Sequence, residues 1–273
     1  MASAIASSPR SLSPEMRALC RVWVMLVMLH ALLHASVARA DDPRKSGFDF
    51  MQSATQALQK DDTQNPAMLW VKDGQALWSR PDGAAKKSCT DCHGDLGKMR
   101  GVAARYPMFS TAQQSVINLG QQINQCRSAR LQAAVWPTES ASLLALEAVI
   151  AMQSRGLPIA PPSQPQLTEA QKRGEALFNQ RIGQIDLSCR DCHETLAGKR
   201  LGGNTIPQAH PTGYPIYRLE WQSIGSLQRR LRGCMTAVRA EPYPYGGSEL
   251  VDLEAFLMTR AAGMKLESPG VRP

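Results

Sequence analysis

Aromatic residues are scarce in this 273-residue chain, where Phe, Trp and Tyr together make up only 5% of the sequence. There is no basic run with interleaved aromatic residues, and this absence argues against a nucleic-acid-binding protein. Beyond residue 40 no apolar run is long enough to span a bilayer. Sustained alternation of apolar and polar residues is also missing, so we do not expect a large β-sheet.

The longest apolar run, residues 22–37, follows two arginines and ends in Ala38-Arg39-Ala40, which has the form of a signal-peptidase site. A membrane anchor is the alternative, but the run is short, contains two histidines and ends in small residues. We therefore expect residues 1–40 to be a signal peptide cleaved near Ala40. The mature chain is expected in the periplasm, without a membrane span.

Two copies of a Cys-x-x-Cys-His motif lie 100 residues apart. Their residues are Cys89, Cys92 and His93 in the first copy and Cys189, Cys192 and His193 in the second. In this motif the thiols add across the vinyl groups of a haem, and the imidazole becomes the proximal iron ligand. A chance pair and two zinc half-sites are the alternatives, but a zinc site needs four ligands that converge in one place. The motifs predict two covalently bound haem c groups.

The formal net charge of +8 does not indicate an acidic partner. Four of the 31 basic residues and one of the 23 acidic residues lie in the expected signal peptide, so cleavage lowers the net charge to +5. Two propionates on each haem bring the loaded protein close to neutrality. The composition therefore gives no support for nucleic-acid binding.

Other short segments recur at offsets of 100 to 108 residues. Gly74-x-Ala-Leu-Trp78 is echoed by Gly174-x-Ala-Leu-Phe178, and the Tyr-Pro pair at 106 recurs at 214. Leu-Glu-Ala at 146–148 recurs at 253–255. The sequence thus predicts an internal duplication of one haem-binding unit.

Cys126 and Cys234 are the cysteines left over from the motifs and the signal peptide, and they occupy equivalent places in the two repeats. One interpretation is a disulfide between them, which requires both to lie at the boundary of the units. The other is that each thiolate is the distal ligand of the haem in its own repeat. The only other mature histidine, His210, has no equivalent in the first repeat and is expected to be a loop or surface residue.

The two cysteines differ in their surroundings. Arg229, Arg230, Arg232 and Arg239 lie within five residues of Cys234, whereas the setting of Cys126 is only moderately basic. Guanidinium groups favour a thiolate and attract oxyanions. In a helix, Arg230 at i−4 lies on the same face as Cys234. Although a solvated basic face or pairing with haem propionates is the alternative, the pattern indicates sulfur chemistry at Cys234.

Sequence signals for the start and end of helices recur at similar places in the two repeats. Asn65-Pro66 predicts a helix start, and Thr168 with Gln171 predicts a capping box at the same place in the second repeat. Apolar stripes at 143–150 and 250–257 each end before a glycine. We therefore expect an all-α fold of two tandem cytochrome c-type domains.

The expected domains are residues 41–157 with the first haem and residues 166–273 with the second haem and the reactive cysteine. A proline-rich linker, residues 158–165, separates them. Residues 41–64 and the tail after Leu266 are polar or contain proline. Interaction arms are one interpretation of these segments, and disorder is the one we favour.

In its motifs and in the spacing of its cysteines, the chain resembles the SoxA family, the dihaem cytochromes of the SoxAX complex of bacterial thiosulfate oxidation. Besides the paired haem motifs and downstream cysteines, the resemblance rests on Arg230-Leu-Arg-Gly-Cys234-Met235-x-x-x-Arg239 followed by Ala240 and Pro242-Tyr243. It covers nearly the whole mature chain. A double haem motif alone occurs in many electron carriers, whereas the Arg-x-x-x-Cys-Met segment is much more restrictive.

The resemblance implies an L-cysteine S-thiosulfotransferase. In such an enzyme Cys234 is catalytic and is found as a persulfide, Cys126 is the distal ligand of the first haem, and Arg230 helps to hold thiosulfate. Thiosulfate is coupled to a cysteine of the SoxYZ carrier, and two electrons pass to haem and to SoxX, a monohaem cytochrome that forms a heterodimer with the chain.

Two other functions stay open at this point. A dihaem thiosulfate dehydrogenase would make tetrathionate without a carrier protein. A plain electron-shuttling cytochrome would have Met or His distal ligands, for which Met108 and Met235 are available, and a bond between Cys126 and Cys234.

Overall fold

The computed structural model describes residues 13–16, 18, 19, 21, 23, 25 and 42–273. Residues 44–273 form one compact unit, and this unit is the fold analysed below. The expected cleavage site at 38–40 lies outside the described residues. Within the described residues, no helix has both the length and the apolar character needed to cross a membrane.

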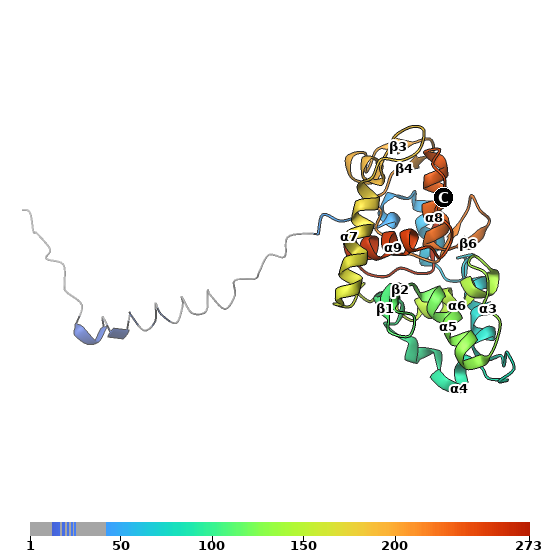
Figure 1. Ribbon diagram of the computed structural model, residues 1–273. Helices are drawn as coiled ribbons and strands as arrows, with labels where there is room; N and C mark the ends of the chain where they lie inside the picture. Colours follow the sequence, from blue (N-terminus) through green and yellow to red (C-terminus); the bar gives the residue numbers. More distant parts are fainter. Residues whose placement is uncertain (1–12, 17, 20, 22, 24, 26–41) are drawn as a thin grey trace, which may run out of the picture. The chain divides into compact units, whose positions relative to one another are not determined.

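Helices are the main secondary structure of the unit (Figure 1). The α-helices are α2 (Ser53–Lys60), α3 (Met68–Ser79), α4 (Cys89–His93), α5 (Leu119–Cys126), α6 (Ala141–Met152), α7 (Pro165–Asn179), α8 (Leu227–Ala237) and α9 (Ser248–Arg260). The 3-10 helices are η1 (Gly47–Phe50), η2 (Leu96–Met99) and η3 (Ala103–Arg105), and the π-helical turns are η4 (Arg127–Leu131) and η5 (Asp191–Thr195).

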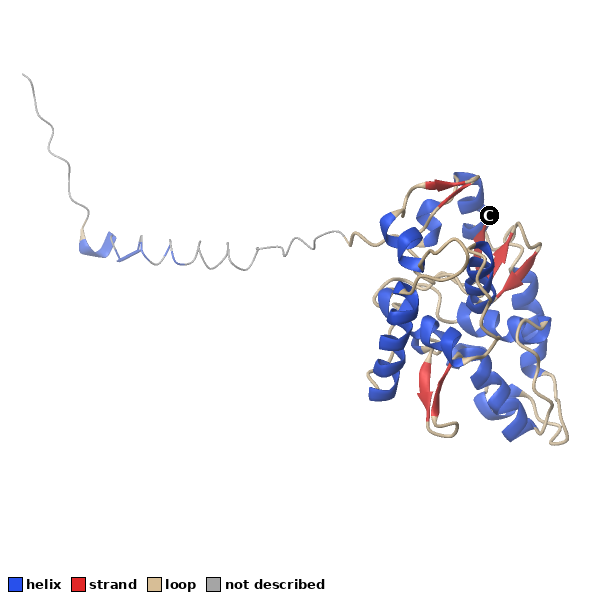
Figure 2. Cartoon of the chain, turned by 45° about the horizontal axis from the view of Figure 1, so that its top comes forward, coloured by secondary structure: helices blue, strands red, loops and turns tan. Residues whose placement is uncertain are grey.

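Short strands accompany the helices, so the all-α expectation is correct only for the main elements (Figure 2). The strands are β1 (Met108–Ser110), β2 (Ser115–Ile117), β3 (Arg200–Leu201), β4 (Asn204–Thr205), β5 (Ile216–Arg218), β6 (Ser223–Gly225) and β7 (Gly270–Arg272). Antiparallel hairpins pair β1 with β2 and β3 with β4, whereas β5 lies between antiparallel β6 and parallel β7. Strands of two or three residues are too short to show an alternating pattern, which is why the sequence did not reveal them.

Two closely packed helix pairs organise the unit. Helix α3 packs against α6, and α7 packs against α9, which it crosses in Figure 1. The contact points are the repeated glycines: a Cβ at Gly74 would overlap the carbonyl of Ala145, and one at Gly174 would overlap that of Asp252. Because each helix lacks a side chain at this point, the two backbones can approach directly. Each pair therefore holds the helix that precedes a Cys-x-x-Cys-His motif.

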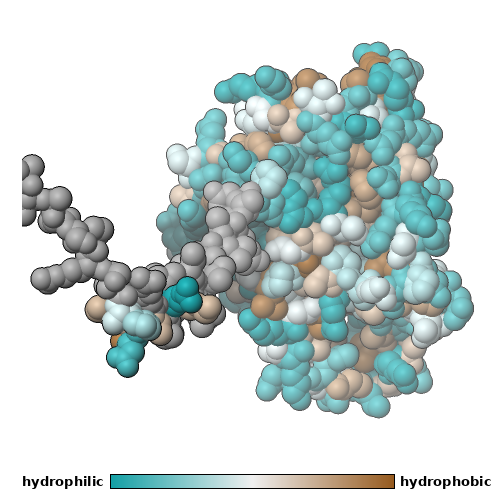
Figure 3. Space-filling model, turned by 90° about the vertical axis from the view of Figure 1, so that its left-hand side faces the viewer, coloured by the Kyte–Doolittle hydropathy of each residue, from teal (hydrophilic) through white to brown (hydrophobic). Residues whose placement is uncertain are grey.

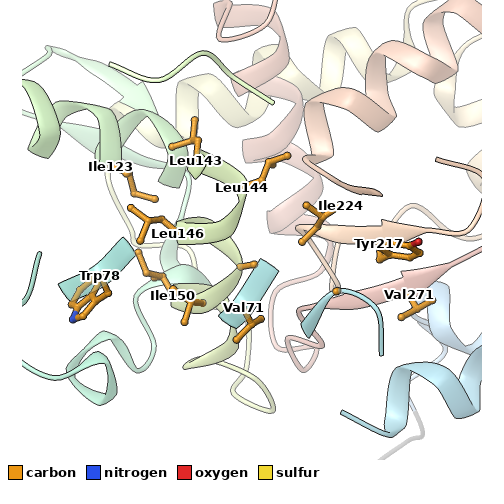
Figure 4. Close-up of a cluster of buried hydrophobic side chains, with 13 residues drawn as sticks. Val71, Trp78, Ile123, Leu143, Leu144, Leu146, Ile150, Tyr217, Ile224 and Val271 are labelled. Atoms are coloured by element: carbon orange, nitrogen blue, oxygen red, sulfur yellow. The ribbon is translucent and has the colours of Figure 1, made fainter. Parts of the chain in front are cut away.

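The largest buried cluster joins the first helix pair to the three-stranded sheet (Figure 4). Val71 and Leu146 come from the helices, while Tyr217, Ile224 and Val271 come from the sheet. Val271 has no exposed surface, and the Trp70 and Tyr217 rings lie 5.9 Å apart. The sheet is thus part of the main core.

On the face of the molecule shown in Figure 3, apolar residues form small scattered patches among polar ones.

Burial of Val271 corrects the expectation for the tail after Leu266, which is ordered and contributes β7. The expectation for residues 41–64 was also wrong, because η1 and α2 form there. The Gln59 side chain accepts a hydrogen bond from the Val271 backbone N–H at 2.9 Å. The two segments stabilise each other, and a pattern read along one segment does not reveal such long-range pairing.

The helix starts match the expectations only in part. Helix α3 begins at Met68, although the Asn65 side chain still caps the preceding turn by accepting from the Ala67 N–H. The capping box at Thr168 was wrong, because α7 already begins at Pro165 and the Thr168 hydroxyl bonds the Gln164 carbonyl. Proline has no backbone N–H, but the N–H of the first helical residue has no acceptor within the helix. Proline is therefore well tolerated at this position, which explains why α7 starts at Pro165.

Replacing Gly74 or Gly174 by alanine is expected to lower stability by about 1–3 kcal/mol each, because the added methyl group overpacks a helix crossing. Thermal or denaturant unfolding of the haem-loaded protein measures this change. Gly97→Ala is the matched control, since a Cβ there meets nothing within 4 Å. Equal stability of all three variants would contradict the direct backbone contact.

Candidate functional site

Each Cys-x-x-Cys-His motif opens onto its own cavity, and each cavity contains the downstream cysteine of the same half. His93, Cys89, Cys92 and Cys126 line a cavity of about 310 Å³. His193 and Cys234 line another of about 370 Å³. The structure thus brings together the residues that the sequence pairs within each repeat.

The motifs are held by a repeated cap. In the first, the Asp91 carboxylate accepts a hydrogen bond from the Ser88 N–H at 2.7 Å, and in the second Asp191 accepts from the Ser188 N–H at 2.9 Å. These bonds lower the pKa of both carboxyl groups, because they favour the ionised form. The serine and aspartate at the same spacing in both motifs therefore fix the start of each thiol-bearing turn.

The first cavity is largely apolar around its thiols. Trp78, Leu146 and Ile150 contribute to its wall. The Gln122 side chain donates a hydrogen bond to the Cys126 sulfur at 3.3 Å, from the preceding turn of α5. Burial raises the pKa of Tyr106, which also lines this cavity, to about 12, so its hydroxyl stays protonated.

The arginine beside Cys126 is fully engaged. Arg127 is buried, forms an ion pair with Asp82 at 2.8 Å and lies over the Trp136 ring at 3.3 Å from its centroid. Its guanidinium also donates to the Ala134 carbonyl. This arginine is therefore a structural residue with few donors left for an anion.

A backbone carbonyl group orients the imidazole ring of His193. Its Nδ1 lies 2.7 Å from the Pro207 carbonyl oxygen, so Nδ1 carries the proton and Nε2 is left to face the cavity. On that side the imidazole is within hydrogen-bonding reach of Cys234. A carbonyl that holds the remote ring nitrogen is the usual support for a metal-ligating histidine.

Cys234 lies among positive charges. Burial alone would raise the pKa of its thiol, but the hydrogen bond with His193 and the charges of Arg230 and Arg218 outweigh burial, and the pKa is lowered. By contrast, burial raises the pKa of Cys189, a motif thiol of the same half, to about 11. The downstream cysteine is therefore the thiolate-prone sulfur of this site.

Arg230 is the arginine near Cys234 that keeps its donors available. It lines the cavity one turn before Cys234 in α8, as the i−4 spacing predicts, and its guanidinium has no hydrogen-bond acceptor within residues 42–273. Its favourable charge partners are Cys234, Tyr214 and Glu220, in order of strength. The site thus presents a cationic fork beside a thiolate.

The other arginines of this segment serve the fold, as the alternative interpretation anticipated for part of the set. Arg229 lies over the Trp221 ring and donates to the Ser223 hydroxyl. Arg232 lies over the Tyr245 ring and donates to the Tyr243 carbonyl. Arg239 is exposed and lines no part of the cavity.

Several residues of the second cavity were not found from the sequence. Arg218, on β5, is 6% exposed and reaches the cavity beside Arg230. His210, expected to be a loop or surface residue, does lie in a loop, but it is only 9% exposed, lines the cavity and has Nδ1 2.8 Å from the Lys45 carbonyl oxygen. The repeat of Tyr-Pro at 106 and 214 was the only signal that pointed to this wall of the cavity, because Tyr214 lines it too.

Cys126 and Cys234 are not bonded to each other. Both are free thiols, and they line different cavities. The residues of the first cavity fit a haem c: a pair of attachment thiols, an imidazole, a cysteine sulfur and apolar wall residues. The second cavity offers the imidazole of His193, the sulfur of Cys234 and apolar wall residues, while its motif thiols, Cys189 and Cys192, precede His193 in the chain without lining the cavity. The disulfide-linked arrangement expected of a plain electron shuttle is absent from residues 42–273.

Comparison with known proteins agrees with this arrangement. The family described as "SoxA/TsdA, cytochrome c domain" matches residues 73–159 and 173–266. This chain belongs to the SoxA/TsdA cytochrome c family. The two matched segments each contain one motif and its downstream cysteine, and together they include both cavities' proposed ligands.

Curated relatives in the family are named "L-cysteine S-thiosulfotransferase subunit SoxA". The one from Rhodovulum sulfidophilum is 34% identical over 90% of this chain and 86% of its own length. The one from Pseudaminobacter salicylatoxidans is 33% identical over 85% and 82%, respectively. A solved structure of SoxXA from P. pantotrophus matches with a TM-score of 0.81 and 28% identity, covering 84% of this chain and 87% of that one.

Asp91→Asn and Asp191→Asn are each expected to lower the melting temperature at pH 7. A carboxyl whose folded pKa is depressed stabilises the fold above its unfolded pKa, near 4, and loses this contribution as pH falls through the folded value. The deficit of both variants should therefore shrink below about pH 4. Asp73→Asn, at an exposed site on α3, is the control; a deficit that persists unchanged at pH 3 would contradict the cap.

Proposed function

We propose that this protein is the dihaem subunit of a thiosulfate-oxidising complex, an L-cysteine S-thiosulfotransferase. It couples thiosulfate to a cysteine of a SoxYZ-type carrier and passes two electrons to haem and on to a SoxX-type cytochrome. The observation that carries this proposal is the juxtaposition of Cys234 with Arg230, whose donors have no acceptor in the described part of the chain. The names of the curated relatives support the same reaction.

The reaction needs a sulfur site beside a cation. When the terminal sulfur of thiosulfate joins a carrier thiol, an S–S bond forms, the thiol proton leaves and two electrons are removed. Arg230 offers planar, permanently charged donors that suit the sulfonate oxygens of a dianion. Bound in this way, thiosulfate directs its terminal sulfur toward Cys234, which is the proposed catalytic residue.

Both haems are proposed to have histidine and cysteine ligands. Cys89 and Cys92 would attach the first haem, and His93 and Cys126 would bind its iron. For the second haem the corresponding residues are Cys189 and Cys192, with His193 and Cys234. When bound, the haems accept electrons at a potential lowered by thiolate ligation.

The two halves are proposed to descend from one duplicated unit, with domains at 41–157 and 166–273 and the linker 158–165 between them. The repeated glycine crossing and the repeated aspartate cap support this division. Pro158 and Ile159 already pack against the second half, since the Ile159 N–H donates to the Met264 carbonyl. The linker is therefore short and held in place.

Export to the periplasm, with cleavage near Ala40, and a heterodimer with a SoxX-type cytochrome complete the proposal. The composition of residues 1–40 supports export. The similar solved structure from P. pantotrophus is of SoxXA, which supports a cytochrome partner of that kind. The carrier protein and thiosulfate are the two substrates.

Intact mass spectrometry of the purified periplasmic protein is expected to show two haem additions on a chain that begins near Asp41. A further mass of about 32 Da on the Cys234 peptide, lost on reduction, would identify a persulfide. A chain with one haem, or a Cys126–Cys234 cross-link, would refute the proposed ligand sets. The Cys126 peptide, which lies beside the engaged Arg127, serves as the internal comparison.

Arg230→Met is expected to reduce kcat/KM for thiosulfate roughly ten- to a hundredfold, because hydrogen bonds to a charged group contribute about 1.5–3 kcal/mol. The loss should appear mainly in KM for thiosulfate, measured with the carrier and a cytochrome acceptor. Arg239→Met is the control, since Arg239 is exposed and lies outside the cavity. Full activity without a carrier would instead indicate a thiosulfate dehydrogenase.

A further inference from the structure

A third cavity, of about 120 Å³, separates the two haem cavities and shares a wall with each of them. Tyr106 and Leu119 line both it and the first haem cavity, while Tyr214 and Leu227 line both it and the second. Its volume is sufficient for about four water molecules at roughly 30 Å³ each. No part of the proposed sulfur chemistry uses this space.

Two carboxylates from equivalent positions of the repeats meet at this cavity. Glu147 comes from α6 and Glu254 from α9, in the two copies of Leu-Glu-Ala. An added Cβ at Gly120 would overlap the Glu147 carboxylate, so the glycine at the start of α5 makes room for it. The Asn118 side chain donates to Glu254 at 3.0 Å, so the cap residue of α5 holds the carboxylate of the opposite half.

The polar groups around the pair are neutral or negative. Gln228, only 1% exposed, faces Glu254; its Oε1 accepts from the Gly246 N–H, while its Nε2 has no acceptor among residues 42–273. Gln121 donates to the Gly246 carbonyl. Among residues 42–273, neither lysine nor arginine lines the cavity. Two ionised carboxylates would therefore repel each other here without a compensating cation.

The other titratable and charged groups near Glu147 and Glu254 lie around the margin of this cavity. Glu139, in the loop before α6, accepts a hydrogen bond from the Ser226 N–H and lies near Arg229 and Tyr245. Tyr106 and Tyr214 are partly buried, and loss of solvent around their phenols raises the pKa of each to about 12, so they do not titrate near neutrality. Burial, together with the charges of Glu254 and Glu139, raises the pKa of Glu147 to about 8. Burial likewise raises the pKa of Glu254 to about 7, against the opposing hydrogen bond from Asn118.

Each cysteine-bearing helix begins at this cavity. Gly120, which contacts Glu147, lies six residues before Cys126 in α5, and Gln228, which faces Glu254, lies six residues before Cys234 in α8. Six residues of α-helix span about 9 Å. At this separation, inside a protein of low effective dielectric, charges in the cavity and in the two haem pockets influence each other.

We propose that Glu147 and Glu254 form a shared proton-binding site that takes up a proton from solvent when a haem in either neighbouring cavity gains an electron. One carboxylate becomes a carboxylic acid, one ferric haem becomes ferrous, and the net charge of the protein is unchanged. When the electron leaves to an oxidant, the proton returns to solvent. The inference rests on haem being held in the two cavities as proposed above, but not on the sulfur chemistry.

The first test is spectroelectrochemistry of the haem-loaded protein with mediators and without thiosulfate or carrier, from pH 5.5 to 9. In the wild-type protein at least one haem potential should fall as pH rises through 7 to 8, with a slope of up to 59 mV per tenfold change in proton concentration. Glu147→Gln and Glu254→Gln should each reduce the slope, and the double variant should remove it from this range. Glu175→Gln, at an exposed site on α7, should leave the slope unchanged.

The second test needs no variant. Reduced-minus-oxidised infrared difference spectra of the wild-type protein at pH 7.5 should show a carboxylic acid C=O band that appears on reduction and shifts in D₂O. A pH slope that persists in the double variant with both haems bound, or the absence of this band, would overturn the proposal and assign the titration to haem propionates. Because no sulfur substrate is present, neither result depends on whether the protein couples thiosulfate to a carrier.

Discussion

The close approach of two helix backbones, made twice, is the constraint on which the rest of the structure depends. Gly74 against Ala145 and Gly174 against Asp252 set the helix pairs α3–α6 and α7–α9. The first helix of each pair leads into a haem motif, while the second carries a glutamate that lines the cavity between the halves. A side chain at either glycine would separate the motif from the wall of its own cavity, so one small residue in each half determines where the thiols, imidazole and cysteine meet.

The two halves share this scaffold but differ in how they use arginine. Beside Cys126, the buried Arg127 is saturated by Asp82, Trp136 and a backbone carbonyl. Beside Cys234, Arg230 retains its donors and Arg218 lies close to it. Two guanidinium groups close together favour the binding of an anion between them. The same sulfur and imidazole can therefore support electron transfer in one half and oxyanion chemistry in the other.

Much of the site could be predicted from the sequence because its chemistry is local. The motif spacing, the equivalent cysteines and the i−4 position of Arg230 are all properties of single segments. Arg218, His210 and the ordered tail could not be found in this way. Their positions depend on the pairing of β5 with β7, two three-residue strands more than fifty residues apart, whose registers are determined by burial of Val271. The repeated Leu-Glu-Ala was visible as a pattern, but only the fold shows that its glutamates face one cavity.

The parallel pairing of β5 with β7 also affects the order in which the protein can be assembled. The first cavity is lined by residues between Trp78 and Ile150, so its wall is complete once slightly more than half of the chain has been made. The wall of the second cavity includes residues from Gly47 to Pro273. A chain that folds from its amino terminus can close the first pocket early, while the pocket of His193 and Cys234 remains unfinished until the last strand is added. The pocket proposed to carry out the chemistry is therefore the last to be enclosed.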